Sequence, residues 1–143
     1  MRRRFFSFWI STAALVGILV AGCGEDPVSE PLSDGVMATF IASNDTFKVW
    51  ITNAQARADV VAVWNGTSTK TIPDGKLNGG PGILEYNVPW AWHIDQDNIQ
   101  MVATAAEECD GTPSEVQADL DEWVNEKGRF CPGGSRLIFL ESL

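Results

Sequence analysis

Residues 36–52 contain two extended segments. Residues 36–42 are almost wholly apolar and suit a strand. In residues 46–52 three apolar side chains alternate with Lys48 and Trp50, which point the other way. The three residues between these segments, Ser43-Asn44-Asp45, have turn chemistry. The pattern therefore predicts a β-hairpin.

A helix is predicted next, over residues 54–64. Asn53 can cap its first turn, and Asn65-Gly66 can end it. Apolar side chains recur at helical spacing on one face, which we expect to lie on the sheet: Ala54, Ala58, Val61 and Trp64.

The middle of the chain alternates extended segments with turn signals. Glycine and proline are frequent in residues 74–82, which predicts an exposed loop there. Further strands are predicted over 67–72, 83–88, 90–95 and 99–108, with a turn at 96–98, and a buried final strand over 137–140.

A second helix is predicted over residues 113–125. Thr112 and Glu115 form the two ends of a capping box, and Pro113 suits the first helical position. The buried face is expected to contain Val116, Leu120, Trp123 and Val124. Together the elements predict one α+β domain over 36–143, a largely antiparallel sheet with two main helices packed on one face.

The N-terminus carries an export signal. Three arginines precede an uncharged run over residues 5–19, which is followed by Val20-Ala21-Gly22-Cys23. A cysteine directly after small residues resembles a bacterial lipoprotein signal. Residues 1–22 are then removed, and Cys23 becomes the lipidated first residue of the mature chain.

The alternative is an uncleaved transmembrane helix, and the run from Phe5 to Ala21 has 17 residues, which is the short limit for such a span. Residues 23–35 are rich in proline and acidic side chains, and we expect a flexible tether. The domain then faces the periplasm or the exterior of a bacterial cell envelope, lipid-anchored to a membrane. Gly24 favours the outer membrane if the cell has two.

The charge of the mature chain is strongly negative. All 19 acidic residues follow Cys23, whereas three of the ten basic residues precede it, which leaves 7 positive charges against 19 negative ones, or −12. Such a domain repels nucleic acid and anionic headgroups. We therefore expect an unidentified protein, or a small neutral or cationic ligand, as partner and no nucleic acid.

Two cysteines remain after acylation of Cys23. In an exported chain, Cys109 and Cys131 are expected to form a disulfide, which should contribute about 3 kcal/mol for a loop of about 20 residues. Zinc is the rival interpretation, but it requires about four close ligands, and the chain has one histidine. We expect no metal and no cofactor.

A resemblance to a known family covers about residues 37–141. Its residues are Tyr86-Asn87-Val88-Pro89-Trp90-Ala91-Trp92-His93-Ile94-Asp95, Glu108-Cys109-Asp110-Gly111-Thr112-Pro113, Leu120-Asp121-Glu122-Trp123, Cys131-Pro132 and Ser135-Arg136-Leu137. The chain resembles the N-terminal-domain family named after a large eukaryotic calmodulin-binding protein, which is also found in small bacterial exported proteins. The resemblance implies no catalytic residues. Calmodulin targets are basic amphipathic helices, and the helix at 113–125 is acidic, so calmodulin binding is not expected.

The candidate ligand-binding residues lie around one predicted strand. They are Trp90, Trp92, His93, Asp95 and Asp110. On a strand over 90–95 the two tryptophans share one face, able to stack on a sugar or an aromatic ligand. His93 and Asp95 share the other face, where a carboxylate would raise the histidine pKa. The rival interpretation is that the tryptophans belong to the core and that His93 and Asp95 form a structural pair.

Three functions follow from these patterns. The first is a lipid-anchored, non-catalytic binding domain whose ligand the sequence does not identify. The second is a small envelope hydrolase or lyase that uses His93 with Asp95. The third is a protease-inhibitor-like domain that presents the loop at 74–82. We expect the first.

Overall fold

The computed structural model describes residues 34–143 as a succession of short strands and helices. The predicted signal peptide (1–22), the predicted acylation site Cys23 and all but the last two residues of the predicted tether (23–35) lie outside the described residues. Within residues 34–143, no helix has the length and apolar character needed to cross a membrane. The α+β class predicted from the sequence fits this part of the chain.

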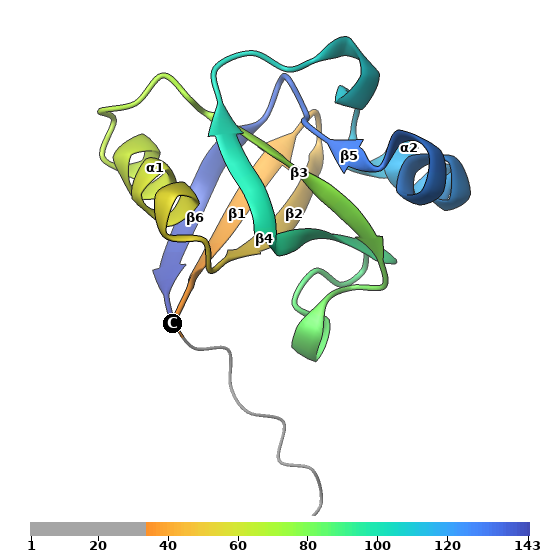
Figure 1. Ribbon diagram of the computed structural model, residues 1–143, viewed down its shortest axis with the longest axis horizontal. Helices are drawn as coiled ribbons and strands as arrows, with labels where there is room; N and C mark the ends of the chain where they lie inside the picture. The colour runs from red at the N-terminus through yellow and green to blue at the C-terminus, as the bar shows by residue number, and fades with distance from the viewer. Residues whose placement is uncertain (1–33) are drawn as a thin grey trace, which may run out of the picture.

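The strands form two antiparallel sheets of three strands each (Figure 1). The first has the order β2-β1-β6, with the bounds Asp45–Ile51, Val36–Ala42 and Arg136–Ser142. The second has the order β4-β3-β5, with the bounds Trp92–Val102, Ile72–Gly79 and Arg129–Phe130. In Figure 1, β3 and β4 cross in front of β1 and β2. The predicted hairpin is confirmed, but the expectation of one sheet is wrong, because the chain builds a second sheet after β2.

The helices lie on different parts of these sheets (Figure 1). The first helix, α1 (Ala54–Trp64), contacts β4 and β6, and its first turn is capped by the side chain of Asn53. The second helix, α2 (Pro113–Ala118), contacts β2 and has the predicted capping box. It is followed by a π-helical segment, η3 (Glu122–Lys127), which contacts β3 and β5. The predicted packing of both helices on one face is therefore corrected.

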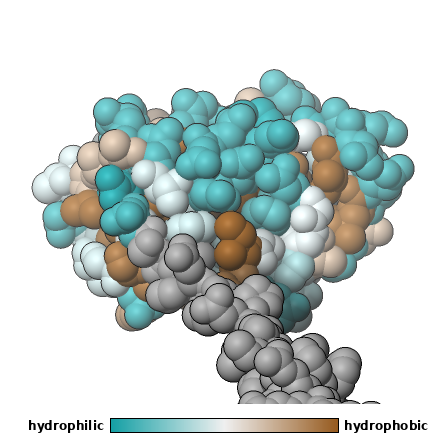
Figure 2. All heavy atoms as spheres, turned by 60° about the horizontal axis from the view of Figure 1, so that its bottom comes forward, coloured by the Kyte–Doolittle hydropathy of each residue, from teal (hydrophilic) through white to brown (hydrophobic). Residues whose placement is uncertain are grey.

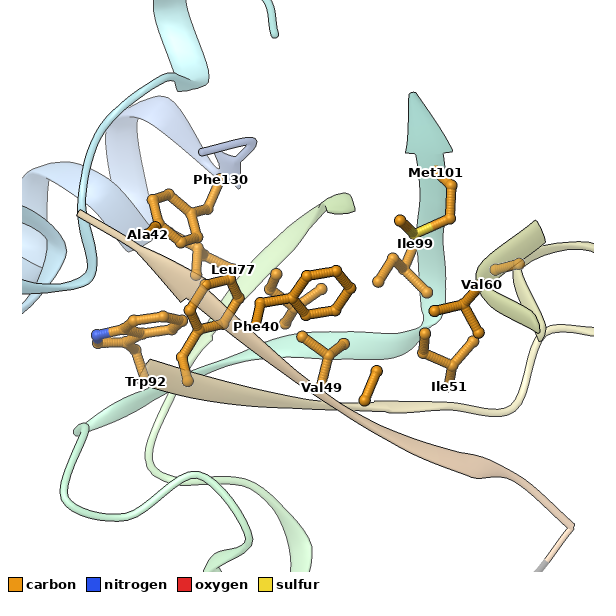
Figure 3. Packing of buried hydrophobic residues seen from close by; sticks show 14 of the residues in the cluster. Phe40, Ala42, Val49, Ile51, Val60, Leu77, Trp92, Ile99, Met101 and Phe130 are labelled. Atoms are coloured by element: carbon orange, nitrogen blue, oxygen red, sulfur yellow. The ribbon is translucent and has the colours of Figure 1, made fainter. Parts of the chain in front are cut away.

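The main core lies between the two sheets, as Figure 3 shows. Phe40 and Val49 come from the first sheet, and Trp92 and Phe130 from the second, and all four are fully buried. The ring of Phe47 lies within 6 Å of the rings of Phe40, Trp92 and Phe130. Since a fully buried side chain of this size contributes about 1.5–3 kcal/mol, this aromatic cluster is the main link between the sheets.

The buried face of α1 is not the predicted one. Ala56 and Val60 are buried, whereas Val61 and Trp64 are exposed. Apolar residues recur at helical spacing on two sides of this helix, so spacing alone does not identify the side that meets the sheets. The predicted buried face of the second helix is confirmed, because Val116 and Trp123 are buried, with Leu120 and Val124 packed on the same core. The single helix predicted over 113–125 is corrected, because α2 ends at Ala118 and the segment continues as η3.

The region predicted as a loop at 74–82 is mostly strand. Strand β3 runs from Ile72 to Gly79 and is the central strand of its sheet, so it is not exposed in the way a protease-inhibiting loop requires. The glycines that indicated turns have another use in this strand: Gly75 and Gly79 lie within the paired segment. The predicted strand at 83–88 is instead a loop that contains a short 3-10 turn, η1 (Ile83–Glu85).

Two further strand predictions change. Strand β4 is continuous from Trp92 to Val102, whereas a turn was predicted at 96–98. The strand predicted to continue to residue 108 ends at Val102, and a second 3-10 turn, η2 (Glu107–Cys109), follows. Strand β6 is an edge strand rather than a buried one. Its register shifts opposite Thr39 and Phe40, which leaves Ile138 without a partner and exposed.

Candidate functional site

A polar cleft lies between the start of α1 and the middle of β4. Its volume is about 640 Å³. Eight of the ten side chains that line it are polar or charged, and they come from α1 and its cap, from β4 and from β5. We call this the polar cleft: Asn53, Gln55, Ala56, Asp59, Asp95, Asp97, Asn98, Ile99, Gln100 and Arg129.

A bulge in β4 supplies one wall of the polar cleft. Residues 75 and 77 of β3 pair with residues 99 and 94 of β4, so a single residue of β3 faces four residues of β4. Residues 95–98 therefore carry three residues more than the ladder needs, which makes a bulge. Gly75 permits this, because a Cβ there would meet the side chain of Ile94 and lie 3.0 Å from the backbone oxygen of Asn98. The cleft therefore depends on a glycine that the sequence presents as a turn residue.

Asp95 organises the bulge through its carboxylate. Oδ1 accepts hydrogen bonds from the backbone N–H of Asp97 (2.9 Å) and of Asn98 (3.2 Å), and Oδ2 accepts one from Nδ2 of Asn78 (3.3 Å). Burial alone would raise the pKa of Asp95, but these hydrogen bonds and the positive charge of Lys76 together hold that pKa below its usual value. Asp95 is therefore ionised at neutral pH.

Two more carboxylates face the polar cleft, and each uses only part of its hydrogen-bonding capacity. Oδ1 of Asp97 accepts from the hydroxyl of Thr52, and Oδ1 of Asp59 accepts from Nε2 of Gln55 at 3.0 Å. No bond to the second oxygen of either carboxylate is found within the described part of the chain. A carboxylate can accept several hydrogen bonds, so both can take a donor from a ligand.

The one cation that lines the polar cleft is already paired. Nη2 of Arg129 lies 2.8 Å from Oδ1 of Asp74, and Nε of Arg129 also donates to that oxygen at 3.0 Å. Asp74 does not line the cleft, and its other oxygen accepts from Gln100. Among the residues that line the cleft, no free cation therefore balances its three aspartates; Lys76, which lowers the pKa of Asp95, does not line it.

His93 lies on the outer side of β4 and holds a loop. It pairs with Asn78 in the ladder, and its Nδ1 donates to the carbonyl of Gly80 at 2.8 Å. A carbonyl only accepts, so Nδ1 carries the proton. Among residues 34–143, neither a hydrogen bond nor an ion pair joins His93 to Asp95, whose oxygens are used by the bulge. The predicted pair is not formed.

The two candidate tryptophans belong to the hydrophobic core. Trp92 is fully buried and lies in the ladder opposite Gly79. Trp90 precedes β4, packs on the same core with its ring 6.0 Å from that of Trp92, and donates from Nε1 to the carbonyl of Thr46 at 2.8 Å. The rival interpretation of these residues is thus the one that the structure favours, and neither tryptophan lines the polar cleft.

Asp110 lies beside the disulfide rather than beside His93. Cys109 and Cys131 are bonded to each other, as predicted. Oδ1 of Asp110 accepts from the backbone N–H of Gly133 at 2.7 Å, which fixes the segment after Cys131. Asp74 lies close to both sulfurs, but sulfurs bonded to each other are not thiolate ligands, so this group does not hold a metal.

Of the candidate residues, only Asp95 lines the polar cleft. Sequence reasoning missed Gln55, Asp59, Gln100 and Arg129. The available signal was the four-residue spacing of Gln55 and Asp59, which places both on one side of the predicted helix. That spacing equally fits a solvated helix face, so it does not identify a site by itself.

Comparison with known proteins identifies the family of this domain. Neither the curated proteins nor the solved structures gave a match. The family model for the BP-74 N-terminal domain matches residues 35–142, which is nearly all of the described chain. Since the matched segment covers both sheets, both helices and the disulfide, this chain belongs to the BP-74 N-terminal domain family.

Proposed function

We propose that this chain is an exported lipoprotein whose domain binds a small organic cation in the polar cleft and catalyses no reaction. The observation that carries the proposal is that Asp59, Asp95 and Asp97 line a cleft of about 640 Å³ whose one lining cation is paired with Asp74. A flexible amine of several charges, such as a polyamine, has donors that match these oxygens.

The cleft favours a cation over a sugar. Its lining contains no aromatic ring on which a sugar can stack, because Trp90 and Trp92 belong to the core. It also lacks an unpaired cation for an anionic ligand, since Arg129 is bound to Asp74. The overall negative charge of the mature chain adds to the attraction of the cleft for a cation.

A catalytic role has less support. A general base must reach the proton that it abstracts, and His93 directs Nδ1 to a backbone carbonyl on the side of β4 that faces away from the core. Ser114 and Ser135 are the serines to consider as nucleophiles. The hydroxyl of Ser114 donates to Asp45, and that of Ser135 is buried. Neither has a histidine partner within the described residues.

The lipid anchor is supported by the sequence alone. Three arginines, an uncharged apolar run and Val20-Ala21-Gly22-Cys23 stand in the order of a lipoprotein signal. Cells that express the full chain are fed a radiolabelled fatty acid, and the chain is then isolated. We expect label in the unaltered chain and none in Cys23→Ser. Equal labelling of the two chains would overturn the anchor.

Binding is tested by calorimetric titration of the full chain, kept in a neutral detergent, with spermidine. Asp59→Asn and Asp97→Asn each remove one charge from the cleft, and Glu126→Gln removes one exposed charge that lies outside it. At low salt we expect each cleft variant to bind about three- to fivefold more weakly. The control should match the unaltered chain. Equal losses in all three variants would indicate attraction to net charge only and would refute the site.

A further inference from the structure

The loop between β3 and β4, residues 80–91, presents aliphatic side chains to solvent. Ile83 is 53% exposed, Leu84 48% and Val88 59%. They lie within six consecutive residues, and Val88 is the most exposed of the large apolar side chains in residues 34–143. Single exposed apolar residues are ordinary, but three on one loop tip indicate a contact surface.

The backbone at the tip of the 80–91 loop is strained. Leu84 has φ +56° and Glu85 has φ +54°, and both are left-handed conformations that side chains with a Cβ rarely adopt. A leucine there is less favourable than a glycine or an asparagine. The fold therefore keeps a large apolar side chain at an exposed position that suits a smaller or polar residue better.

The loop is nevertheless held firmly to the domain. Asn87 is 1% exposed, accepts from the backbone N–H of Lys48 at 2.8 Å and donates to the carbonyl of Trp92 at 2.8 Å. The hydroxyl of Tyr86 donates to the carbonyl of Ile94, and His93 fixes the start of the loop at Gly80. These bonds come from both sheets. The aliphatic tip is therefore a fixed projection.

This projection lies at the end of the domain where the preceding part of the chain is attached. A Cβ on Gly35 would meet the indole of Trp50, and Trp50 shares a buried cluster with Met37 and Tyr86. Tyr86 belongs to the 80–91 loop. In Figure 1 the loop and the start of β1 both lie on the lower side of the molecule. Figure 2 brings that side forward and shows hydrophobic patches among hydrophilic side chains.

We propose that the tip of the 80–91 loop inserts Ile83, Leu84 and Val88 into the bilayer that anchors the chain, an inference that rests on the proposed lipid anchor. Ten residues separate Cys23 from Asp34, so the connection reaches at most about 40 Å when extended. This short connection attaches beside the loop, so the anchor brings the tip toward the lipid. Because the mature chain is strongly acidic, the bilayer it suits is zwitterionic rather than anionic.

The test uses the full acylated chain in vesicles of phosphatidylcholine. Leu84→Cys and, separately, Val88→Cys receive a nitroxide spin label, and Thr69→Cys, in the loop between α1 and β3, serves as the control. With Cys23 acylated and Cys109 bonded to Cys131, the new thiol is the one available for labelling. We expect labels at 84 and 88 to lose most of their accessibility to a water-soluble nickel complex while remaining accessible to oxygen. The label at 69 should remain accessible to both.

A charge at the tip sharpens the test. Leu84→Asp places a charge there, and aspartate adopts a left-handed φ more readily than most residues. In a chain that carries this change, the spin label at 88 should be fully accessible to the nickel complex. Val61→Asp, which places the same charge on the exposed side of α1, should leave that label inserted. Circular dichroism checks that both variants fold.

The outcomes separate this inference from the proposed anchor. If the chain does not associate with the vesicles at all, the anchor fails. If it associates and the label at 88 is as accessible to nickel as the label at 69, the insertion fails and the anchor stands. Shielding that requires an added protein, and not lipid alone, would likewise overturn the insertion.

Discussion

Replacing Gly75 by alanine tests the origin of the polar cleft. Gly75 lies in β3, with Phe130 of β5 on one side and Ile99 of β4 on the other. An added Cβ would overlap the fully buried side chain of Ile94, lie 3.0 Å from the backbone oxygen of Asn98 and lie 3.3 Å from Cβ of Ile99. Backbone oxygen and a β-branched core side chain cannot move aside without shifting β4.

The magnitude follows from these contacts. Adding one methyl group to a well-packed core typically costs about 1–3 kcal/mol. The same change at a strand glycine with space around it gains up to about 1 kcal/mol, because the unfolded chain loses freedom. Gly79 provides that matched site, since a Cβ there has nothing within 4 Å. The two variants should therefore differ by about 1–4 kcal/mol in free energy of unfolding.

Both variants are compared with the unaltered chain in urea and heat unfolding, with the disulfide kept oxidised. Gly75→Ala should lower the Tm by about 4–12 °C, and Gly79→Ala should leave it unchanged or raise it slightly. Gly75→Ala should also weaken spermidine binding, because the residues that it displaces line the polar cleft. If the two variants unfold within about 2 °C of each other, steric demand at Gly75 does not set the bulge.

Three other predictions concern stability. Asn87→Ala removes the side-chain partners of a part-buried backbone N–H, that of Lys48, and of a buried carbonyl, that of Trp92, and should destabilise by about 2–4 kcal/mol in urea. At the exposed Asn125, the change to alanine should cost under about 1 kcal/mol. The pKa of Asp95 is lowered in the folded state, so its ionised form stabilises the fold at any pH above the ordinary pKa of about 3.9. This contribution is lost as the pH falls through the folded pKa. Asp95→Asn should therefore destabilise the fold at about pH 6 and have little effect at about pH 2. Replacing Cys109 and Cys131 by alanine opens a loop of 22 residues and should cost about 3 kcal/mol, and an unchanged midpoint would contradict the entropic estimate.

The elements with strong local signals were predictable. The capping side chain of Asn53 and the capping box at Thr112 appear as expected, because a cap satisfies backbone groups within a few residues of itself. The hairpin of β1 and β2 has the same property, since its turn joins adjacent strands. Such features depend little on the rest of the fold.

The strands of the second sheet were less predictable because glycine has two uses. Gly75 permits the close approach of β4, which is a contact with a residue distant in sequence. A sequence does not distinguish such a glycine from one that forms a turn. The turn signal at 96–98 corresponds to a real local turn, since the carboxylate of Asp95 accepts from the backbone N–H groups of Asp97 and Asn98. It forms a bulge within a strand instead of ending one, and only the partner strand decides between these outcomes.

The candidate site was also predictable only in part. Alternation along residues 92–95 correctly separates Trp92 and Ile94, which are buried, from His93 and Asp95, which are not. Alternation does not say which neighbours a side chain meets. The carboxylate of Asp95 is taken up by its own turn and His93 by Gly80, so two residues on one face of a strand make no pair.

The two proposed binding features lie at different parts of β4 and can be separated by experiment. The bulge at 95–98 forms a wall of the polar cleft, whereas the start of the strand secures the 80–91 loop through Trp92 and His93. A change at Gly75 acts on the bulge, while Leu84→Asp changes a side chain that is half exposed and outside the core. Gly75→Ala should therefore weaken spermidine binding with little effect on insertion of the loop, and Leu84→Asp should do the reverse. If either variant removed both properties, the cleft and the loop would be coupled through β4, and the description of two independent surfaces would be incorrect.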